Sequence, residues 1–112
     1  MLLSQITFGV ELEYAGLTRF DATMAVVAAL ESFGLYQSHN AFYPFTVTMT
    51  DGRVWRIVTD GSVRSGCEAV SPICTTEDND IAVIQEVMRR LVAAGGRCGP
   101  GSGAGLHMHI GM

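Results

Sequence analysis

The sequence predicts an α+β fold in which two helices pack on one face of an antiparallel or mixed sheet. Alternating apolar and polar residues, which are typical of strands, occur near both ends of the chain and in its middle. Two intervening segments carry apolar residues at helical spacing. The resulting order of strand, helix, hairpin, strand, helix and strand indicates the α+β class. Because 112 residues with 48% hydrophobic content can form one core, we expect residues 1–112 to be a single domain.

The first predicted strand covers residues 5–14 and alternates strictly. Successive side chains of a strand point to opposite faces, so Glu11 and Glu13 lie side by side on the face that also carries Thr7 and Gly9. The opposite face is apolar and is expected to pack on the core; it carries Ile6, Phe8, Val10, Leu12 and Tyr14. The carboxylate pair therefore predicts either a cation site or a solvent-exposed strand face.

The first predicted helix follows a turn at residues 15–18. Asp21 is a good N-cap, and Gly34 is a suitable stop after Phe33. Apolar residues recur at helical spacing between these two signals; they are Met24, Val27, Ala28 and Leu30. We expect a helix from about Asp21 to Phe33 with one apolar stripe.

The middle of the chain predicts a β-hairpin and one further strand. Residues 45–50 alternate large apolar side chains with threonines, and Asp51-Gly52 forms a two-residue hairpin turn into residues 53–59. Trp55 is expected in the core rather than on a ligand-stacking surface. The further strand covers residues 68–71.

The second predicted helix runs from about Thr76 to Ala94 and ends at two glycines. Residues 95–105 are rich in glycine, which indicates either a flexible connector or a backbone loop that approaches a ligand closely.

The last predicted strand covers residues 105–112 and repeats the pattern of the first. His107 and His109 share one face, and the other face is apolar, with Leu106, Met108, Ile110 and Met112. Two imidazoles in such a strand predict either a metal site or an exposed face. A terminal strand also leaves an unpaired edge, which favours a homo-oligomer.

Composition excludes several classes of protein. The formal charge of −4 argues against binding to nucleic acid or to an anionic membrane surface. The N-terminus lacks a cationic n-region, and no apolar run approaches the roughly 20 residues of a transmembrane helix, so we expect a cytoplasmic protein. Cys67, Cys74 and Cys98 have no Cys-x-x-Cys spacing and are expected to be buried, reduced thiols.

Three short blocks, in this order, resemble the amidoligase family, a branch of the carboxylate–amine ligases that includes glutamine synthetase and glutamate–cysteine ligase. The first block is Phe-Gly-Val-Glu-Leu-Glu at residues 8–13, and the last is Gly-Leu-His-Met-His-Ile at residues 105–110. The middle block runs from Trp55 through Asp-Gly-Ser-Val at residues 60–63 to Glu-Ala-Val-Ser-Pro at residues 68–72. Together the blocks cover almost all of the chain.

The resemblance implies an ATP-dependent ligase that joins a carboxylate to an amine through an acyl phosphate, with an amino acid or peptide as substrate. It implies one or two Mg²⁺ ions, or Mn²⁺ in their place, because hard divalent ions neutralise ATP phosphates and prefer carboxylate oxygens. Glu11, Glu13 and Glu68 would supply the carboxylate ligands, and His107 would bind a second ion. His109 would bind an ion or orient substrate. Asp60 and Ser62 match a turn at the family's active site, and Arg56 and Arg64 are candidates for phosphate or carboxylate contacts.

The resemblance also implies half of a glutamine-synthetase-like catalytic domain. The sequence stops at Met112, whereas members of the family continue with further basic residues and another acidic ligand. A truncated reading frame, a split enzyme completed by a second chain, and a non-catalytic binding or assembly module are the three explanations. A His-x-His zinc hydrolase is a further alternative, although no zinc motif spacing supports it.

Overall fold

A computed structural model of the chain describes residues 6–36, 45–59, 66–76, 79–98 and 105–111. Its elements, in chain order, are β1 (Thr7–Ala15), α1 (Arg19–Ser32), β2 (Thr46–Thr48), β3 (Val54–Val58), β4 (Gly66–Val70), β5 (Cys74–Thr75), α2 (Asp80–Ala93) and β6 (Leu106–Gly111). Asp60, Ser62 and Arg64 lie outside the described residues.

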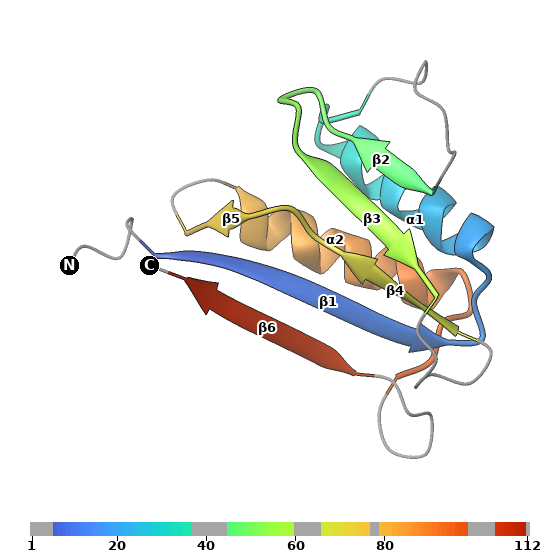
Figure 1. Cartoon of the computed structure of the whole chain (residues 1–112). Coiled ribbons are helices and arrows are strands. Elements are labelled where there is room, and N and C mark those ends of the chain that lie inside the picture. Colours follow the sequence, from blue (N-terminus) through green and yellow to red (C-terminus); the bar gives the residue numbers. More distant parts are fainter. Residues whose placement is uncertain (1–5, 37–44, 60–65, 77–78, 99–104, 112) are drawn as a thin grey trace.

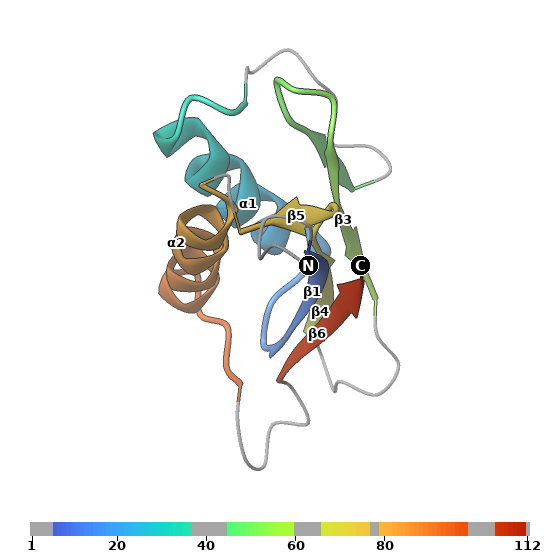
Figure 2. The same cartoon turned by 90° about the vertical axis from the view of Figure 1, so that its left-hand side faces the viewer.

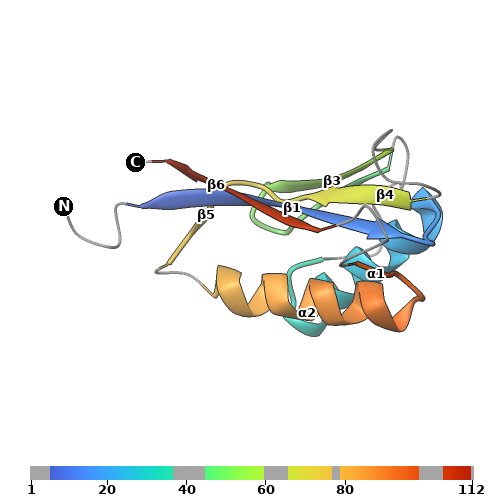
Figure 3. The same cartoon turned by 90° about the horizontal axis from the view of Figure 1, so that it is seen from below.

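The strands form one antiparallel sheet in which β1 has partners on both edges. β4 and the short β5 pair with one edge of β1, and β6 pairs with the other. The hairpin β2–β3 extends the sheet beyond β4. Both helices cover the same face of this sheet (Figures 2 and 3). The predicted α+β class is therefore confirmed, with a fully antiparallel sheet in the described part of the chain.

The core lies between the helices and the apolar face of the sheet. The predicted apolar face of β1 is buried, because Phe8, Val10, Leu12 and Tyr14 all belong to the core, although Glu13 on the other face is buried as well. Trp55 is only 1% exposed and belongs to the same core, as expected from the sequence. The opposite face of the sheet is consequently left for Glu11, Glu13 and their neighbours.

Both helices begin at residues other than those predicted. Thr18, not Asp21, is the N-cap of α1, because the Thr18 hydroxyl accepts a hydrogen bond of 3.0 Å from the Asp21 backbone N–H. α2 begins at Asp80 rather than Thr76. Asp80 is buried, and its carboxylate accepts bonds from the Arg53 guanidinium and from the Thr75 backbone N–H, which ties the start of α2 to β5.

The hairpin turn also differs from the predicted two-residue type. The Gly52 N–H donates to the Met49 carbonyl and the Met49 N–H donates to the Arg53 carbonyl, so the loop has one more residue than expected. Gly52 has a φ of 92°, as in the three-residue loops that end with a left-handed residue. The pairing of Val47 with Trp55 follows from this longer loop.

The apolar face of β6 is not covered in the described structure, contrary to the expectation for the last strand. Leu106, Met108 and Ile110 are 53, 54 and 69% exposed. They line one side of an open apolar groove of about 400 Å³, and Ile81 and Ile84 of α2 line the other. β6 is thus held to the sheet by backbone pairing with β1, while its side chains remain accessible.

The three cysteines differ in their exposure. Cys67 and Cys74 are buried as expected, but Cys98 is exposed. Burial raises the pKa of the Cys67 thiol to about 11, so it is a poor nucleophile at neutral pH. Neither of the described helices has the length and apolar character needed to cross a bilayer.

Candidate metal centre

A cluster of acidic and imidazole side chains lies on the sheet face opposite the helices. It is built from three adjacent strands, β4, β1 and β6. The sheet register places Glu13 directly opposite Glu68 on β4, and Glu11 directly opposite His107 on β6. The antiparallel pairing of β1 with β6 therefore joins residues from the two ends of the chain.

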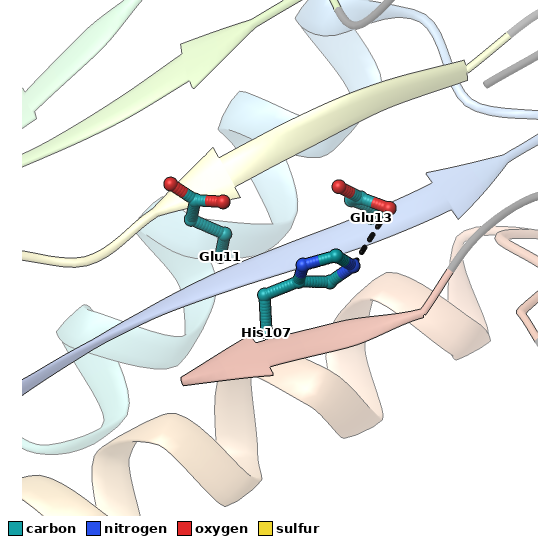
Figure 4. Close-up of side chains that lie close together, drawn as sticks. All are labelled: Glu11, Glu13 and His107. Carbon is teal, nitrogen blue, oxygen red and sulfur yellow. Dashed lines mark ion pairs between the residues drawn. The ribbon is translucent and has the colours of Figure 1, made fainter. Parts of the chain in front are cut away.

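Three of these side chains lie close enough to hold one ion. One ligand atom from each of Glu11, Glu13 and His107 lies within 4.8 Å of the others (Figure 4). The His107 Nε2 atom is 3.5 Å from the Glu13 carboxylate. On the same face, the His109 Nε2 atom is 3.3 Å from the Glu11 carboxylate. Each histidine thus contacts a glutamate diagonally across the strand pair.

The cluster has a buried base and an accessible rim. The Glu13 side chain is only 10% exposed and that of Glu11 is 33% exposed. His107 and His109 expose 57 and 69% of their side chains. An ion bound between the carboxylates would therefore be fixed on the protein side and open to a substrate or to water on the other.

The electrostatics of the cluster favour a cation. Glu13 and Glu68 are carboxyl groups at directly opposite positions, and two ionised carboxylates placed in this way destabilise a sheet unless something neutralises them. The pKa of Glu11 lies below its ordinary value of 4.5, chiefly because of a hydrogen bond with the Glu68 side chain. Burial opposes this shift and His109 adds to it. Glu11 is consequently ionised at neutral pH.

Five of the predicted site residues lie together on this sheet face, and Arg56 lies farther along it. Glu11, Glu13 and His107 form the cluster, while Glu68 and His109 each contact Glu11. Arg56 is on the same sheet face, in the row that passes from Glu11 through Val70 to β3. Since neighbouring strands are about 4.8 Å apart, Arg56 lies roughly 10 Å from Glu11 along the sheet.

Two further residues support the cluster and were not recognised as such in the sequence. The Ser71 hydroxyl accepts a hydrogen bond of 2.9 Å from the Val10 backbone N–H and so fixes β1 beside the end of β4. Gly9 leaves the polar face beside Glu11 without a side chain, although a Cβ there would meet only Ser71 at 3.9 Å. A serine before a proline and a glycine within an alternating strand are the only sequence signals for these roles.

The donor set fits a hard divalent ion. Carboxylate oxygens are the ligands that Mg²⁺ prefers, and an imidazole nitrogen makes Mn²⁺ an equally suitable occupant. Glu11 and Glu13 would bind such an ion, with His107 completing the protein ligands and water filling the other positions. The accessible rim is consistent with an ion that also contacts a substrate.

The chain was compared with known families, curated proteins and solved structures. A family model described as "Putative amidoligase enzyme" matches residues 4–112. No curated protein and no solved structure matches the chain. The matched region includes all three strands that form the candidate metal centre.

Proposed function

Because the chain belongs to the amidoligase family, we propose that it is an ATP-dependent carboxylate–amine ligase that forms an amide bond on an amino acid or peptide. A carboxylate oxygen would attack the γ-phosphorus of ATP, releasing ADP and forming an acyl phosphate. The amine nitrogen would then attack the acyl carbon, and inorganic phosphate would leave. The relation to glutamine synthetase and a cytoplasmic location are parts of this proposal.

The observation that carries the proposal is the convergence of Glu11, Glu13 and His107 on one sheet face. Phosphoryl transfer develops charge on the phosphate oxygens, and a bound divalent ion neutralises that charge. An acidic cluster with a buried base and an accessible rim suits this chemistry, because it holds the ion while leaving coordination positions for the nucleotide.

The remaining polar residues are assigned roles either from their positions on the sheet or from the family resemblance. Arg56 is within the reach of a triphosphate anchored at Glu11, so we assign it to a phosphate or carboxylate contact. His109 contacts Glu11 from the accessible rim, with 69% of its side chain exposed, and is assigned to orienting the substrate. Asp60 and Ser62 as substrate residues and Arg64 as a nucleotide contact are assigned from the family resemblance alone.

The proposal is tested by measuring ADP release in the presence of Mg²⁺ or Mn²⁺ with mixtures of amino acids as carboxylate and amine donors. Glu11→Gln and Glu68→Gln are nearly isosteric and each removes one negative charge from the cluster. We expect each to reduce ADP release at least about 100-fold, because metal-bound charge stabilisation contributes several kcal/mol to such reactions.

Glu31→Gln is the matched control, since Glu31 is an exposed carboxylate on α1, which lies on the opposite face of the sheet. It should leave ADP release unchanged. Wild-type ADP release that is insensitive to both cluster substitutions would refute the proposal. Metal binding with no ADP formed, whichever amine is supplied, would instead identify a non-catalytic binding or assembly module.

A further inference from the structure

The outer edge of β6 presents backbone groups with which no described strand pairs. The Glu13 N–H donates to the Gly105 carbonyl, so backbone groups of the odd-numbered residues in this strand point toward β1. The N–H and C=O groups of Leu106, Met108 and Ile110 therefore point away from the sheet. No described strand pairs with that edge (Figure 1), and its side chains are all exposed.

Such an edge normally carries a device that prevents pairing with another chain, for example a proline, a lysine or a bulge. The described part of β6 has none of these and pairs with β1 without interruption from Leu106 to Gly111. It is therefore a suitable template for an added strand.

The residue pattern around Met108 indicates which strand would pair there. Reading outward in both directions from Met108, the chain has histidine at the first position, an aliphatic residue at the second and glycine at the third. An antiparallel pair of identical strands is related by a two-fold axis, so each position meets its mirror in the sequence. Because the pattern is symmetric about Met108, residues of the same kind then face each other, histidine with histidine and aliphatic with aliphatic.

We propose that a second copy of this chain pairs with β6, antiparallel and with Met108 opposite Met108 of the partner subunit. The outward groups of Leu106, Met108 and Ile110 then form reciprocal hydrogen bonds with the same set in the partner. The apolar faces of both β6 strands lie on the helix side and join the two grooves bordered by Ile81 and Ile84 into one.

This register also brings the two metal centres together. His107 faces His109 of the partner subunit as a non-hydrogen-bonded pair, in which the Cα atoms are about 4.5 Å apart and the side chains are closest. Both imidazoles project on the face that carries Glu11 and Glu13. The partner subunit thus contributes an imidazole beside each carboxylate cluster.

The exposed apolar side chains of β6 cover too small an area to hold this dimer alone, so we expect a bound ion to strengthen it. Leu106, Met108 and Ile110 are 53, 54 and 69% exposed, and three such side chains fall well short of the about 800 Å² per partner of a standard interface. Backbone pairing and shared metal coordination must supply the remainder. The dimer is accordingly weak in chelator and tighter with Mn²⁺.

Sedimentation velocity of the full chain, in EDTA and in Mn²⁺, tests the inference. We expect the mass of the sedimenting species to double when Mn²⁺ is added. Met108→Pro removes an outward N–H that plays no part in pairing with β1, so it should abolish the dimer and leave the fold intact. Met108→Ala keeps the N–H and is its control.

Cross-linking tests the register independently of metal. In a Cys98→Ser background, Met108→Cys places two thiols across the two-fold axis at a Cα separation of about 5.5 Å, which a disulfide spans. Oxidised dimer should form about tenfold faster, or more, than with Ile73→Cys, because pairing raises the local thiol concentration. Ile73 is 70% exposed and lies between β4 and β5, which pair with the edge of β1 opposite β6, so it is the control.

The outcomes separate this inference from the proposed function. Wild-type protein that binds Mn²⁺ by electron paramagnetic resonance yet stays monomeric overturns the shared arrangement and leaves the proposed ligase unaffected. A Met108→Pro variant that dimerises like the wild type overturns the register. Absence of Mn²⁺ binding in both proteins overturns the inference and also removes the metal centre on which the ligase proposal depends.

Discussion

At the scale of single residues, the defining feature is the opposition of Glu13 and Glu68 across β1 and β4. Two ionised carboxylates at directly opposite positions cost a sheet stability, and Glu13 is additionally buried. The arrangement is understandable as a cation site that costs stability when the protein is metal-free.

This interpretation predicts that Glu68→Gln stabilises the metal-free protein while weakening its metal site. The substitution removes the repulsion with Glu13 and leaves an amide that can donate a hydrogen bond to Glu11. We expect the free energy of unfolding in EDTA to rise by about 0.5 kcal/mol. Urea denaturation in EDTA and Mn²⁺ titration measure the two effects.

Glu31→Gln serves as the control here too and should change neither quantity. A Glu68→Gln protein that is less stable than the wild type in EDTA would show that Glu68 has a structural role instead.

At the scale of elements, the starts of the helices depend on capping contacts more than on apolar periodicity. Thr18 caps α1 through its hydroxyl, and Asp21 contributes only its backbone N–H and a charge in the first turn. Asp80 anchors α2 through Arg53 and Thr75, although the apolar pattern permits an earlier start.

Capping predicts different costs for two alanine substitutions in α1. Thr18→Ala leaves the Asp21 N–H without its partner and should lower the free energy of unfolding by about 1 kcal/mol. Asp21→Ala removes only the favourable charge near the helix N-terminus, so its cost should be about 0.5 kcal/mol or less. Urea denaturation of both variants at neutral pH compares them.

Thr18→Ser keeps the hydroxyl and should resemble the wild type. If Asp21→Ala were the more costly substitution, the cap would be Asp21, as the sequence alone predicted.

At the scale of the whole molecule, β1 connects all parts of the site. It pairs with β4 and β5 on one edge and with β6 on the other, and its apolar face contributes to the core. A ligand bound across β4, β1 and β6 therefore links segments that are far apart in the sequence. Binding to the folded state alone must stabilise the entire fold.

We accordingly expect Mn²⁺ to raise the thermal unfolding midpoint, and the increase to depend on pH. Ion binding at 100 times the dissociation constant stabilises the folded state by about 2.7 kcal/mol. The pKa of Glu11 is lowered in the folded protein, so its carboxylate is fully available above pH 4.5 and is lost as the pH falls below that value. Differential scanning fluorimetry between pH 7 and pH 3.5 follows both effects.

The Mn²⁺-dependent increase should become smaller as the pH falls and disappear in acid, because protons compete with the ion for its ligands, and it should be small in Glu11→Gln at every pH. An increase of the same size in that variant would place the ion elsewhere on the protein.

Particular residues show how far sequence reasoning reached. The alternation in β1 identified its buried and polar faces, and Glu11, Glu13 and His107 were recognised as candidate ligands that the structure brings together. The turn after Met49 was misassigned by one residue, because Asp-Gly occurs in both two-residue and longer hairpin loops. Cys98 was expected to be buried and is exposed.

The sequence by itself determined the fold class, the faces of the strands and the residue types of the candidate site, because these follow from local periodicity and side-chain chemistry. The tertiary structure alone decided that β6 pairs with β1, which opposes Glu11 to His107, and that Glu13 faces Glu68. It also decided that the described residues leave the apolar side of β6 uncovered. Strand pairing between distant segments depends on loop closure and on competition among alternative registers, neither of which local patterns encode.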